Sequence, residues 1–334
     1  MTGTHRLGRS SVETTRLGFG GAPLGNLFSV VAETAAEAAL AAAWDAGWRY
    51  FDTAPLYGHG LGERRIGSFL RQKPRDSYRL STKVGRLLAP QAGRVDGGAY
   101  VEVPNSAPVY DYSREGALRS VEASLERLGV GRIDILLIHD IDRFTHGAEQ
   151  PRRFREAMDG AYPALAGLRS KGVVGAIGIG VNDWQVAEAV ARAADIDCVL
   201  LAGRYTLLEQ DSLASFLPLC REKGISIIAG GVFNSGILAT GPTVGAVYNY
   251  APAPQAILDR VAALDRVCKA HGVPLAAAAL QFPLAHPAVA TVVVGARSAG
   301  EIETNRSLLA HPTPPALWAD LKAEGLIAKD APTP

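Results

Sequence analysis

Four polar residues in the first half of the chain have types that together could transfer a proton: Asp52, Tyr57, Lys83 and His139. A tyrosine hydroxyl ordinarily has a pKa near ~10, and a lysine ammonium beside it favours the phenolate and lowers that pKa. An aspartate keeps the ammonium charged and in place, and a histidine can donate a hydrogen bond to a carbonyl oxygen. Such a group would protonate a carbonyl oxygen as hydride reaches the carbon, or take a proton from an alcohol in the reverse reaction.

Each of these residues also has an ordinary structural explanation. Asp52 could cap a loop, and Tyr57 could be a loop aromatic. Lys83 could be a solvated charge, and His139 could be a satisfied core histidine. All four, however, fall at or just after the end of a predicted strand, which favours one common site. The sequence has no H-E-x-x-H spacing or paired carboxylates of a metal site, and no G-x-S-x-G motif of a hydrolase.

The elements that must position these residues alternate between strand and helix along the chain. Eight strands are predicted near residues 17, 50, 80, 135, 176, 199, 227 and 292, each followed by a helix. They are short and apolar on both faces, as in a parallel sheet. The pattern predicts an α/β fold, a single (β/α)8 TIM barrel over residues 1–330, with a frayed tail at residues 331–334. Chemistry in this fold lies at the C-terminal strand ends, where Asp52, Lys83 and His139 fall.

A doubly wound dinucleotide-binding sheet is the rival fold, and it requires G-x-G-x-x-G after its first strand. Neither candidate segment, residues 18–23 or residues 178–183, supplies the third glycine. The barrel is therefore the predicted fold. Residues 84–112 are predicted as a long irregular stretch before a helix at residues 114–128, for which Ser113 is the expected N-cap.

Composition excludes several classes of protein. The chain has 334 residues and 48% hydrophobic residues, which fits a large buried core rather than a disordered chain. Its formal net charge is +1, which argues against a dedicated nucleic-acid partner. The sequence contains neither a run of ~18 apolar residues nor a secretory signal, so no membrane partner is expected. Cys198, Cys220 and Cys268 are expected to be buried small hydrophobes in a reduced, cytoplasmic protein.

Four segments resemble signature segments of the aldo-keto reductase superfamily, in order over nearly the whole chain. They are residues 47–58 (GWRYFDTAPLYG) with Gly62-Glu63 and Ile66-Gly67, residues 81–83 (STK), residues 133–139 (IDILLIH), and residues 293–298 (VVGARS) with Glu301 and Asn305. The resemblance implies that Asp52, Tyr57, Lys83 and His139 form a catalytic tetrad. Tyr57 would be the proton donor or acceptor, tuned by Lys83 and Asp52, and His139 would orient the substrate oxygen. The implied cofactor is a nicotinamide dinucleotide, bound without a dinucleotide fold.

The same resemblance implies a set of cofactor-binding residues, with some departures from the family pattern. Asn182 would hold the nicotinamide carboxamide, although Gly180 or Val181 replaces the usual serine, and Ala202 stands where the family often has glutamine. Phe233 would stack on the nicotinamide because Gly230-Gly231 replaces the usual aromatic. The remaining expected contacts are Gly21, Asn234, Ser235, Gly236, Gly295, Arg297, Glu301 and Asn305.

The identity of the dinucleotide depends on its adenosine 2′-phosphate, which requires arginine or lysine. Arg297 is available, but Glu301 falls about where many NADP-preferring members carry arginine. A carboxylate would repel phosphate and could accept a hydrogen bond from a ribose hydroxyl. We therefore expect NAD, with NADP as the alternative.

Residues 19–27, 110–113 and 203–208 are similar to the bacterial sugar-dehydrogenase branch of the superfamily, which contains D-threo-aldose, L-fucose and pyridoxal 4-dehydrogenases. This implies oxidation of a cyclic aldose hemiacetal to a lactone, with Tyr57 as the base. The substrate, a sugar or an aldehyde, would contact residues 84–112, residues 248–250, Asp140, Trp184 and Arg204. For Asp140 and Arg204 a salt bridge or a structural role is the alternative.

Three other readings remain open. The chain could be a general NADPH-dependent carbonyl reductase, or a dinucleotide-binding, redox-sensing subunit with slow turnover. It could also be an unrelated barrel lyase or hydrolase, in which Lys83 is the only plausible Schiff-base lysine. The oligomeric state is open between monomer and homo-oligomer.

Overall fold

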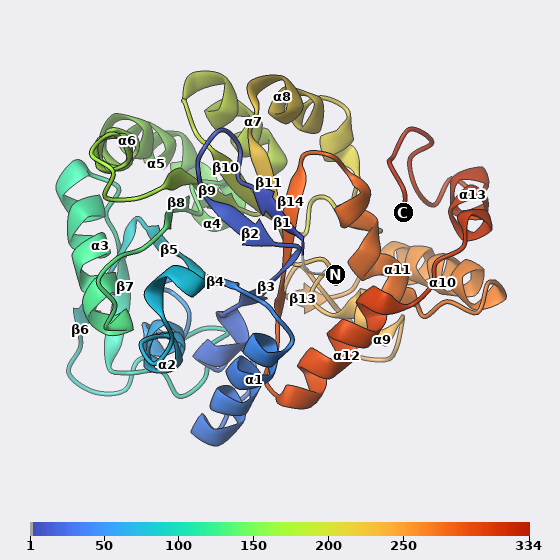
Figure 1. Ribbon diagram of the computed structural model, residues 1–334, viewed down its shortest axis with the longest axis horizontal. Coiled ribbons are helices and arrows are strands. Elements are labelled where there is room, and N and C mark those ends of the chain that lie inside the picture. Colours follow the sequence, from blue (N-terminus) through green and yellow to red (C-terminus); the bar gives the residue numbers. More distant parts are fainter. Residues whose placement is uncertain (1–2) are drawn as a thin grey trace.

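Eight parallel strands close into a barrel in the computed structural model, which describes residues 3–334. The strands follow one another around the barrel in chain order, and the last pairs with the first. This confirms the predicted (β/α)8 fold (Figure 1). The strands are β3 (Leu17–Gly20), β4 (Tyr50–Asp52), β5 (Arg79–Val84), β8 (Ile135–His139), β9 (Ala176–Val181), β10 (Cys198–Ala202), β11 (Ser226–Gly230) and β14 (Val289–Gly295).

Helices surround the strands, and most begin and end within a few residues of the predicted bounds. Ser113 caps its helix as expected, because its side chain accepts a hydrogen bond from the Gly116 N–H. The helices are α1 (Glu33–Asp45), α2 (Leu61–Leu70), α3 (Arg114–Leu128), α4 (Arg143–His146), α5 (Gln150–Glu156), α6 (Tyr162–Ser170), α7 (Trp184–Ala193), α8 (Phe216–Lys223), α9 (Ile237–Thr240), α10 (Gln255–Ala270), α11 (Leu275–Gln281), α12 (Ala299–Ala310) and α13 (Pro315–Ala323).

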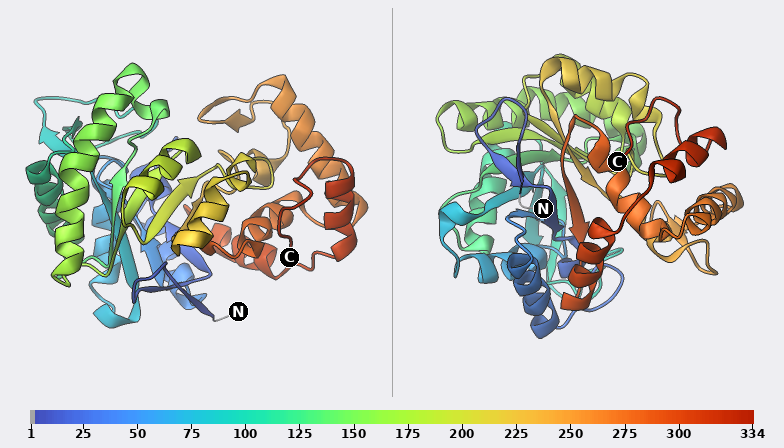
Figure 2. Two further views of the ribbon diagram at one scale, coloured as in Figure 1. Left: turned by 90° about the horizontal axis from the view of Figure 1, so that it is seen from above. Right: turned by 45° about the vertical axis from the view of Figure 1, so that its right-hand side comes forward.

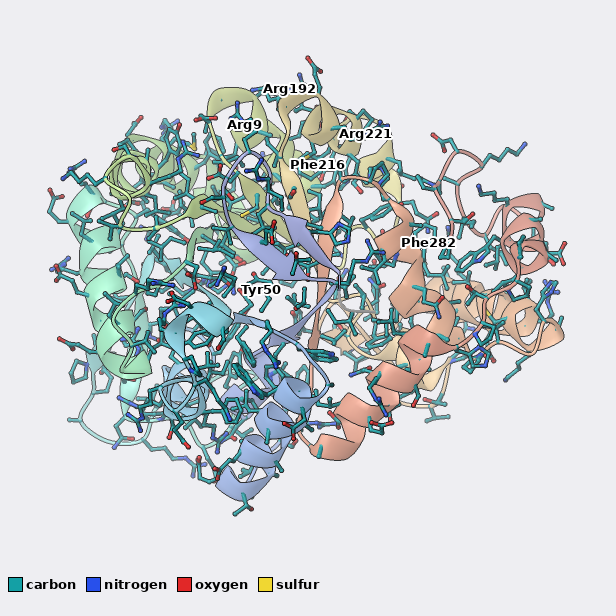
Figure 3. All side chains as sticks on the ribbon, viewed as in Figure 1. Arg9, Tyr50, Arg192, Phe216, Arg221 and Phe282 are labelled. Atoms are coloured by element: carbon teal, nitrogen blue, oxygen red, sulfur yellow. The ribbon has the colours of Figure 1, made fainter. Side chains whose placement is uncertain are left out.

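Alternate residues of each strand face two different cores, because side chains along a strand point to opposite faces. One cluster, with Tyr50, Leu137 and Leu200, fills the inside of the barrel. The other, with Phe51, Leu136 and Phe282, lies between the strands and the helices. Figure 3 shows Tyr50 near the middle of the barrel and Phe282 among the outer elements. The three cysteines are buried and free, as predicted.

An N-terminal hairpin that the sequence pattern did not predict covers one end of the barrel. It consists of β1 (Thr4–Arg6) and β2 (Glu13–Thr15), and its loop buries Leu7 and Val12 in the inner cluster. The Gly8 N–H donates to Ser226 Oγ over 2.7 Å. A Cβ on Gly8 would lie 2.2 Å from the Asp197 carbonyl oxygen, and its φ is +54°, so only glycine fits there. In the left view of Figure 2 this hairpin lies on the lower side of the molecule.

Residues 84–112 are more regular than predicted. β6 (Arg86–Pro90) pairs antiparallel with β7 (Ser106–Tyr110). A second short hairpin, outside this stretch, is formed by β12 (Val247–Tyr248) and β13 (Ala251–Pro252). The sequence gives no tight hairpin turn between β6 and β7, because residues 91–105 separate them, so the usual two-residue signal is absent. The intervening segment pairs with the loop after β3, where the Phe28 N–H donates to Ala99 O and the Val101 N–H donates to Asn26 O.

The C-terminal part also differs from the sequence pattern. Helix α13 was not predicted, and Ala331, which the pattern places in a frayed tail, is 1% exposed and belongs to the outer core. Among residues 3–334, no helix has the length and apolar character needed to cross a bilayer.

Candidate active site

The register of the barrel strands brings three of the four predicted residues to one end of the barrel interior. Asp52, Lys83 and His139 continue the inward-facing rows of Tyr50, Ser81 and Leu137, two residues further along each strand. Tyr57 follows β4 in the loop before α2. The structure therefore places the predicted tetrad in a single cluster at the C-terminal strand ends.

Lys83 is the centre of this cluster and is 1% exposed. Its Nζ donates to Asp52 Oδ2 over 2.8 Å, to the Thr53 carbonyl oxygen over 2.9 Å and to the Tyr57 hydroxyl over 3.0 Å. A Cβ at Gly180 would lie 3.2 Å from Lys83 Cε, so this glycine on β9 leaves space for the lysine stem. The three hydrogen bonds fix the ammonium against Tyr57.

Two further residues that sequence reasoning missed hold Asp52 in place. The Ser81 hydroxyl donates to Asp52 Oδ1 over 2.7 Å, and the Tyr50 hydroxyl lies 2.9 Å from Ser81 Oγ. Because the proton of Ser81 is used on Asp52, Tyr50 is the donor to Ser81. The sequence signal for them was strand alternation: Tyr50 precedes Asp52 by two residues and Ser81 precedes Lys83 by two, so each pair shares a strand face.

The pKa of Tyr57 moves in the opposite direction from the sequence-based expectation. Burial raises it well above 10, the charges of Asp52 and Asp140 raise it further, and Arg86 only partly opposes the rise. The net direction is therefore a raised pKa and not the expected lowered one, because desolvation of the phenolate and the nearby carboxylates outweigh the opposing positive charge. Tyr57 is a phenol at neutral pH, which suits it to donate a proton.

His139 lies edge-on to Tyr57, with ring centroids 6.0 Å apart and an angle of 84° between the rings. Burial, together with the positive charges of Arg86 and Lys83, lowers the pKa of His139 well below 6.5. The imidazole is therefore neutral and carries one N–H. Its Nε2 lies 3.4 Å from Asp140 Oδ2, and its buried Nδ1 has no hydrogen-bond partner among the described residues.

Aromatic side chains from the loops adjoin Tyr57. The ring of Tyr100, from the segment between β6 and β7, lies 6.2 Å from that of Tyr57, between centroids. Tyr250, from the predicted segment at residues 248–250, lies close enough to contribute to the raised pKa of Tyr57. Tyr100 was not singled out in the sequence, because nothing local distinguishes it from other loop aromatics. The cluster can thus protonate or deprotonate an oxygen in a partly desolvated site.

Asn182, expected to bind the nicotinamide, lies beside the tetrad. Its Nδ2 is 3.5 Å from Asp140 Oδ1, and its N–H donates to Asp142 Oδ2 over 2.9 Å. Arg204 Nε donates to the Asn182 carbonyl oxygen over 2.8 Å. Arg204 and Trp184 line a cavity of about 300 Å³ with Asn182, whereas Asp140 does not. Trp184 and Arg204 therefore share one cavity, and Asp140 adjoins it through Asn182.

The segment expected to contact the pyrophosphate follows β11. Asn234 is buried, its Nδ2 donates to Gly203 O over 3.2 Å, and its Oδ1 has no partner among the described residues. Ser235 Oγ accepts from the Tyr250 N–H over 3.3 Å, and Phe233 packs against the outer core. A Cβ on Gly236 would meet no atom within 4 Å. The unpaired Asn234 oxygen and the open backbone at Gly236 fit a polar ligand here.

The second expected cofactor segment runs from the end of β14 into α12. Glu301 accepts from the Arg297 N–H over 2.8 Å and from Arg297 Nη2 over 3.3 Å, and Asn305 is buried on α12. Gly295 and Gly21 also have packing roles. A Cβ on Gly295 would lie 2.5 Å from Pro23 Cγ, and one on Gly21 would lie 2.7 Å from Ile66 Cδ1.

Residues 16–324 match the model of the Aldo/keto reductase family. The chain belongs to the aldo/keto reductase family. It is accordingly an oxidoreductase, and this family uses nicotinamide dinucleotide cofactors and small-molecule substrates. The motif residue Glu63 has a structural part in this aldo/keto reductase, because it accepts from Thr82 Oγ1 over 2.7 Å and from Arg127 Nε over 2.5 Å.

Two curated relatives match this aldo/keto reductase over nearly their full lengths. It is 42% identical to pyridoxal 4-dehydrogenase of Microbacterium luteolum, over 96% of this chain and 97% of that one. It is 43% identical to D-threo-aldose 1-dehydrogenase of a Pseudomonas species, over 95% of each chain. Among solved structures, an aldo-keto reductase from Bacillus halodurans in its holo form is 26% identical, with a TM-score of 0.74 over 98% of this chain and 96% of that one.

Proposed function

We propose that the protein transfers hydride between a nicotinamide dinucleotide and a sugar or aldehyde, and that it oxidises the anomeric carbon of an aldose to a lactone. The observation that carries the proposal is the 3.0 Å hydrogen bond from Lys83 Nζ to the Tyr57 hydroxyl, with Asp52 on the other side of the ammonium. The names of the Microbacterium and Pseudomonas relatives, both dehydrogenases, support the oxidative direction.

Tyr57 is the general acid or base in this proposal. In reduction, the phenol donates its proton to the carbonyl oxygen, and Lys83 stabilises the phenolate that forms. In oxidation, the phenolate takes the proton from the anomeric hydroxyl. His139 is neutral and orients the substrate oxygen through an N–H donor. Tyr57 and His139 thus hold the same oxygen from two sides.

The cofactor would be held by residues from three segments. Asn182 would bind the nicotinamide amide and Phe233 would pack against the ring. The remaining proposed contacts are Gly21, Asn234, Ser235, Gly236, Gly295, Arg297, Glu301 and Asn305. When bound, the dinucleotide supplies or accepts the hydride. NAD is the proposed form, since Glu301 already pairs with the Arg297 guanidinium that a 2′-phosphate would need.

A general carbonyl reductase is the second candidate. The raised pKa of Tyr57 favours it, because a phenol that holds its proton is better suited to donate than to accept. This candidate shares the tetrad with the first and differs in direction and in cofactor.

The test is nicotinamide absorbance with aldoses, pyridoxal and simple aldehydes, using NAD and NADP in both oxidation states. We expect NAD reduction by an aldose, lost in Tyr57→Phe, which retains dinucleotide binding. Activity only with NADPH in the reductive direction would favour the second candidate. Dinucleotide binding without turnover would overturn both and favour a redox-sensing subunit.

A further inference from the structure

Asp140 is held in a strained conformation directly after the catalytic His139. Its φ is +48°, in the left-handed region that non-glycine residues seldom adopt. Its N–H donates to Gly180 O over 2.8 Å, and its carbonyl oxygen accepts from the Tyr112 hydroxyl over 3.0 Å. Strained residues of this kind persist where surrounding contacts hold them, often at functional sites. In this backbone conformation the Asp140 side chain lies beside His139.

A buried arginine fixes the Asp140 carboxylate. Arg86, the first residue of β6, donates from Nη2 to Asp140 Oδ2 over 2.8 Å, and its guanidinium lies 5.0 Å from the centroid of the Tyr110 ring. The side chains of Arg86 and Asp140 are 4% and 11% exposed. Burial and the charge of Asp142 raise the pKa of Asp140, and the paired Arg86 guanidinium opposes that rise.

The Asp140 carboxylate also adjoins the reaction site. Its Oδ2 lies 3.4 Å from His139 Nε2, and its Oδ1 lies 3.5 Å from Asn182 Nδ2, both long for a hydrogen bond. Its charge reaches Tyr57, whose pKa it raises. A hydrogen-bond donor on His139 and a charged acceptor on Asp140 therefore stand side by side.

We propose that Asp140, positioned by Arg86, accepts a hydrogen bond from a hydroxyl on the carbon next to the reacting carbon. His139 would hold the reacting oxygen, and Asp140 the neighbouring hydroxyl. The substrates are then 2-hydroxy aldehydes and their cyclic hemiacetals, and simple aldehydes are poor substrates. This inference rests on the proposed hydride transfer and specifies its substrate class. Hydrogen bonds to charged groups are the strong ones, and a site built for a hydroxyl discriminates against an analogue that lacks it.

The first test uses the unaltered protein with matched substrates. Reduction of glycolaldehyde is compared with reduction of acetaldehyde, and an aldose with its 2-deoxy counterpart. We expect kcat/KM to favour the hydroxylated member of each pair by roughly 10-fold or more. Equal values within each pair would overturn the inference while leaving the proposed hydride transfer intact. Absence of turnover with every carbonyl would overturn the proposed function and the inference with it.

The second test changes the acceptor and its positioning residue. In Asp140→Asn and in Arg86→Gln we expect the preference for the hydroxylated substrate to shrink several-fold, mainly through KM for that substrate. The double variant Arg86→Gln with Asp140→Asn removes both charges together, so it controls for an unpaired buried charge. Asp159→Asn, at an exposed carboxylate, is the matched control. An unchanged preference, or an equal loss of kcat/KM with both substrates of a pair, would show a merely structural pair.

Discussion

The Nζ atom of Lys83 donates to the Tyr57 hydroxyl over 3.0 Å, and this is one of three hydrogen bonds that the ammonium makes. An ammonium has three protons, so Lys83 has no donor left for a substrate. Lys83 is also 1% exposed, which leaves no access for a carbonyl carbon. The geometry therefore favours a lysine that tunes Tyr57, and it argues against the Schiff-base chemistry of a lyase.

The pH dependence of turnover is expected to differ between the two directions. Because the pKa of Tyr57 is raised, the phenol persists through neutral pH, so reductive kcat should be flat there. Oxidative kcat should rise with pH, since the base form grows as pH approaches the raised pKa. Asp140→Asn removes one cause of the raised pKa and should move the oxidative limb to lower pH. Profiles measured under saturating substrate check this, and an unmoved limb would contradict it.

Removing either member of the buried pair of Asp52 and Lys83 should lower the free energy of unfolding. Lys83→Met leaves the Asp52 carboxylate without its cation and is expected to destabilise the fold by about 3–5 kcal/mol. Asp52→Asn leaves the Lys83 ammonium without its anion and is also expected to destabilise the fold. The double variant should cost less than the sum of the two, because neither charge is then isolated. Denaturant unfolding measures all three proteins, and strictly additive losses would argue against coupling.

The sequence was sufficient where the signal is local or repeats along the chain. Alternating short apolar strands and helices predicted the eight strands, and the strand ends predicted Asp52, Lys83 and His139. The contact between Arg86 and Asp140 could not be predicted, because it joins residues 54 positions apart. Arg86 begins β6, and the sequence has no turn signal that would reveal the hairpin to which β6 belongs. The direction of the Tyr57 pKa shift could not be predicted either, because it depends on how deeply the hydroxyl is buried.

Cofactor preference should respond to the carboxylate of Glu301. In Glu301→Gln the guanidinium of Arg297 loses its anionic partner, so it becomes available to a 2′-phosphate. We expect kcat/KM for NADP relative to NAD to rise roughly 10-fold, as for one added charge-assisted hydrogen bond. Glu303→Gln on the same helix breaks a pair with Arg306 instead and serves as the control. An equal change in the NADP-to-NAD ratio of kcat/KM in both variants would show that Glu301 does not contact the cofactor.

Two glycines on helices should give opposite responses to alanine. A Cβ on Gly67 of α2 would lie 2.1 Å from the Leu128 carbonyl oxygen at the end of α3, so Gly67→Ala must separate the two helices. We expect a loss of about 1–3 kcal/mol, as for overpacking. A Cβ on Gly167 of α6 meets no atom within 4 Å, and Gly167→Ala should stabilise the fold by up to ~1 kcal/mol. Thermal unfolding midpoints that move in the same direction would contradict this pair.

His286 should make the fold less stable in acid. Burial, with the Arg221 charge, lowers the pKa of His286 to about 4, and its Nδ1 accepts from the Ala288 N–H over 3.1 Å. The unfolded chain binds this proton near pH ~6.5 and the folded chain does not, so stability falls as pH drops from ~6.5 to about 4. We expect a loss of about 1–2 kcal/mol after allowing for solvent screening.

The matched variants are His286→Asn, which keeps an acceptor, and His311→Asn, which changes a ring that contacts the Pro312 carbonyl instead. Unfolding free energy measured at both pH values should lose part of its acid dependence only in His286→Asn. The same acid dependence in both variants would assign it to other groups.

The hairpin of β1 and β2 packs against parts of the chain that are synthesised much later. Its loop residues Leu7 and Val12 belong to the same buried cluster as Leu200 and Val293, and the Gly8 N–H donates to Ser226 Oγ. Ribosomes make the chain from its N-terminus, so the hairpin emerges long before the surfaces that receive it exist. The hairpin can therefore cover its end of the barrel only late in biogenesis.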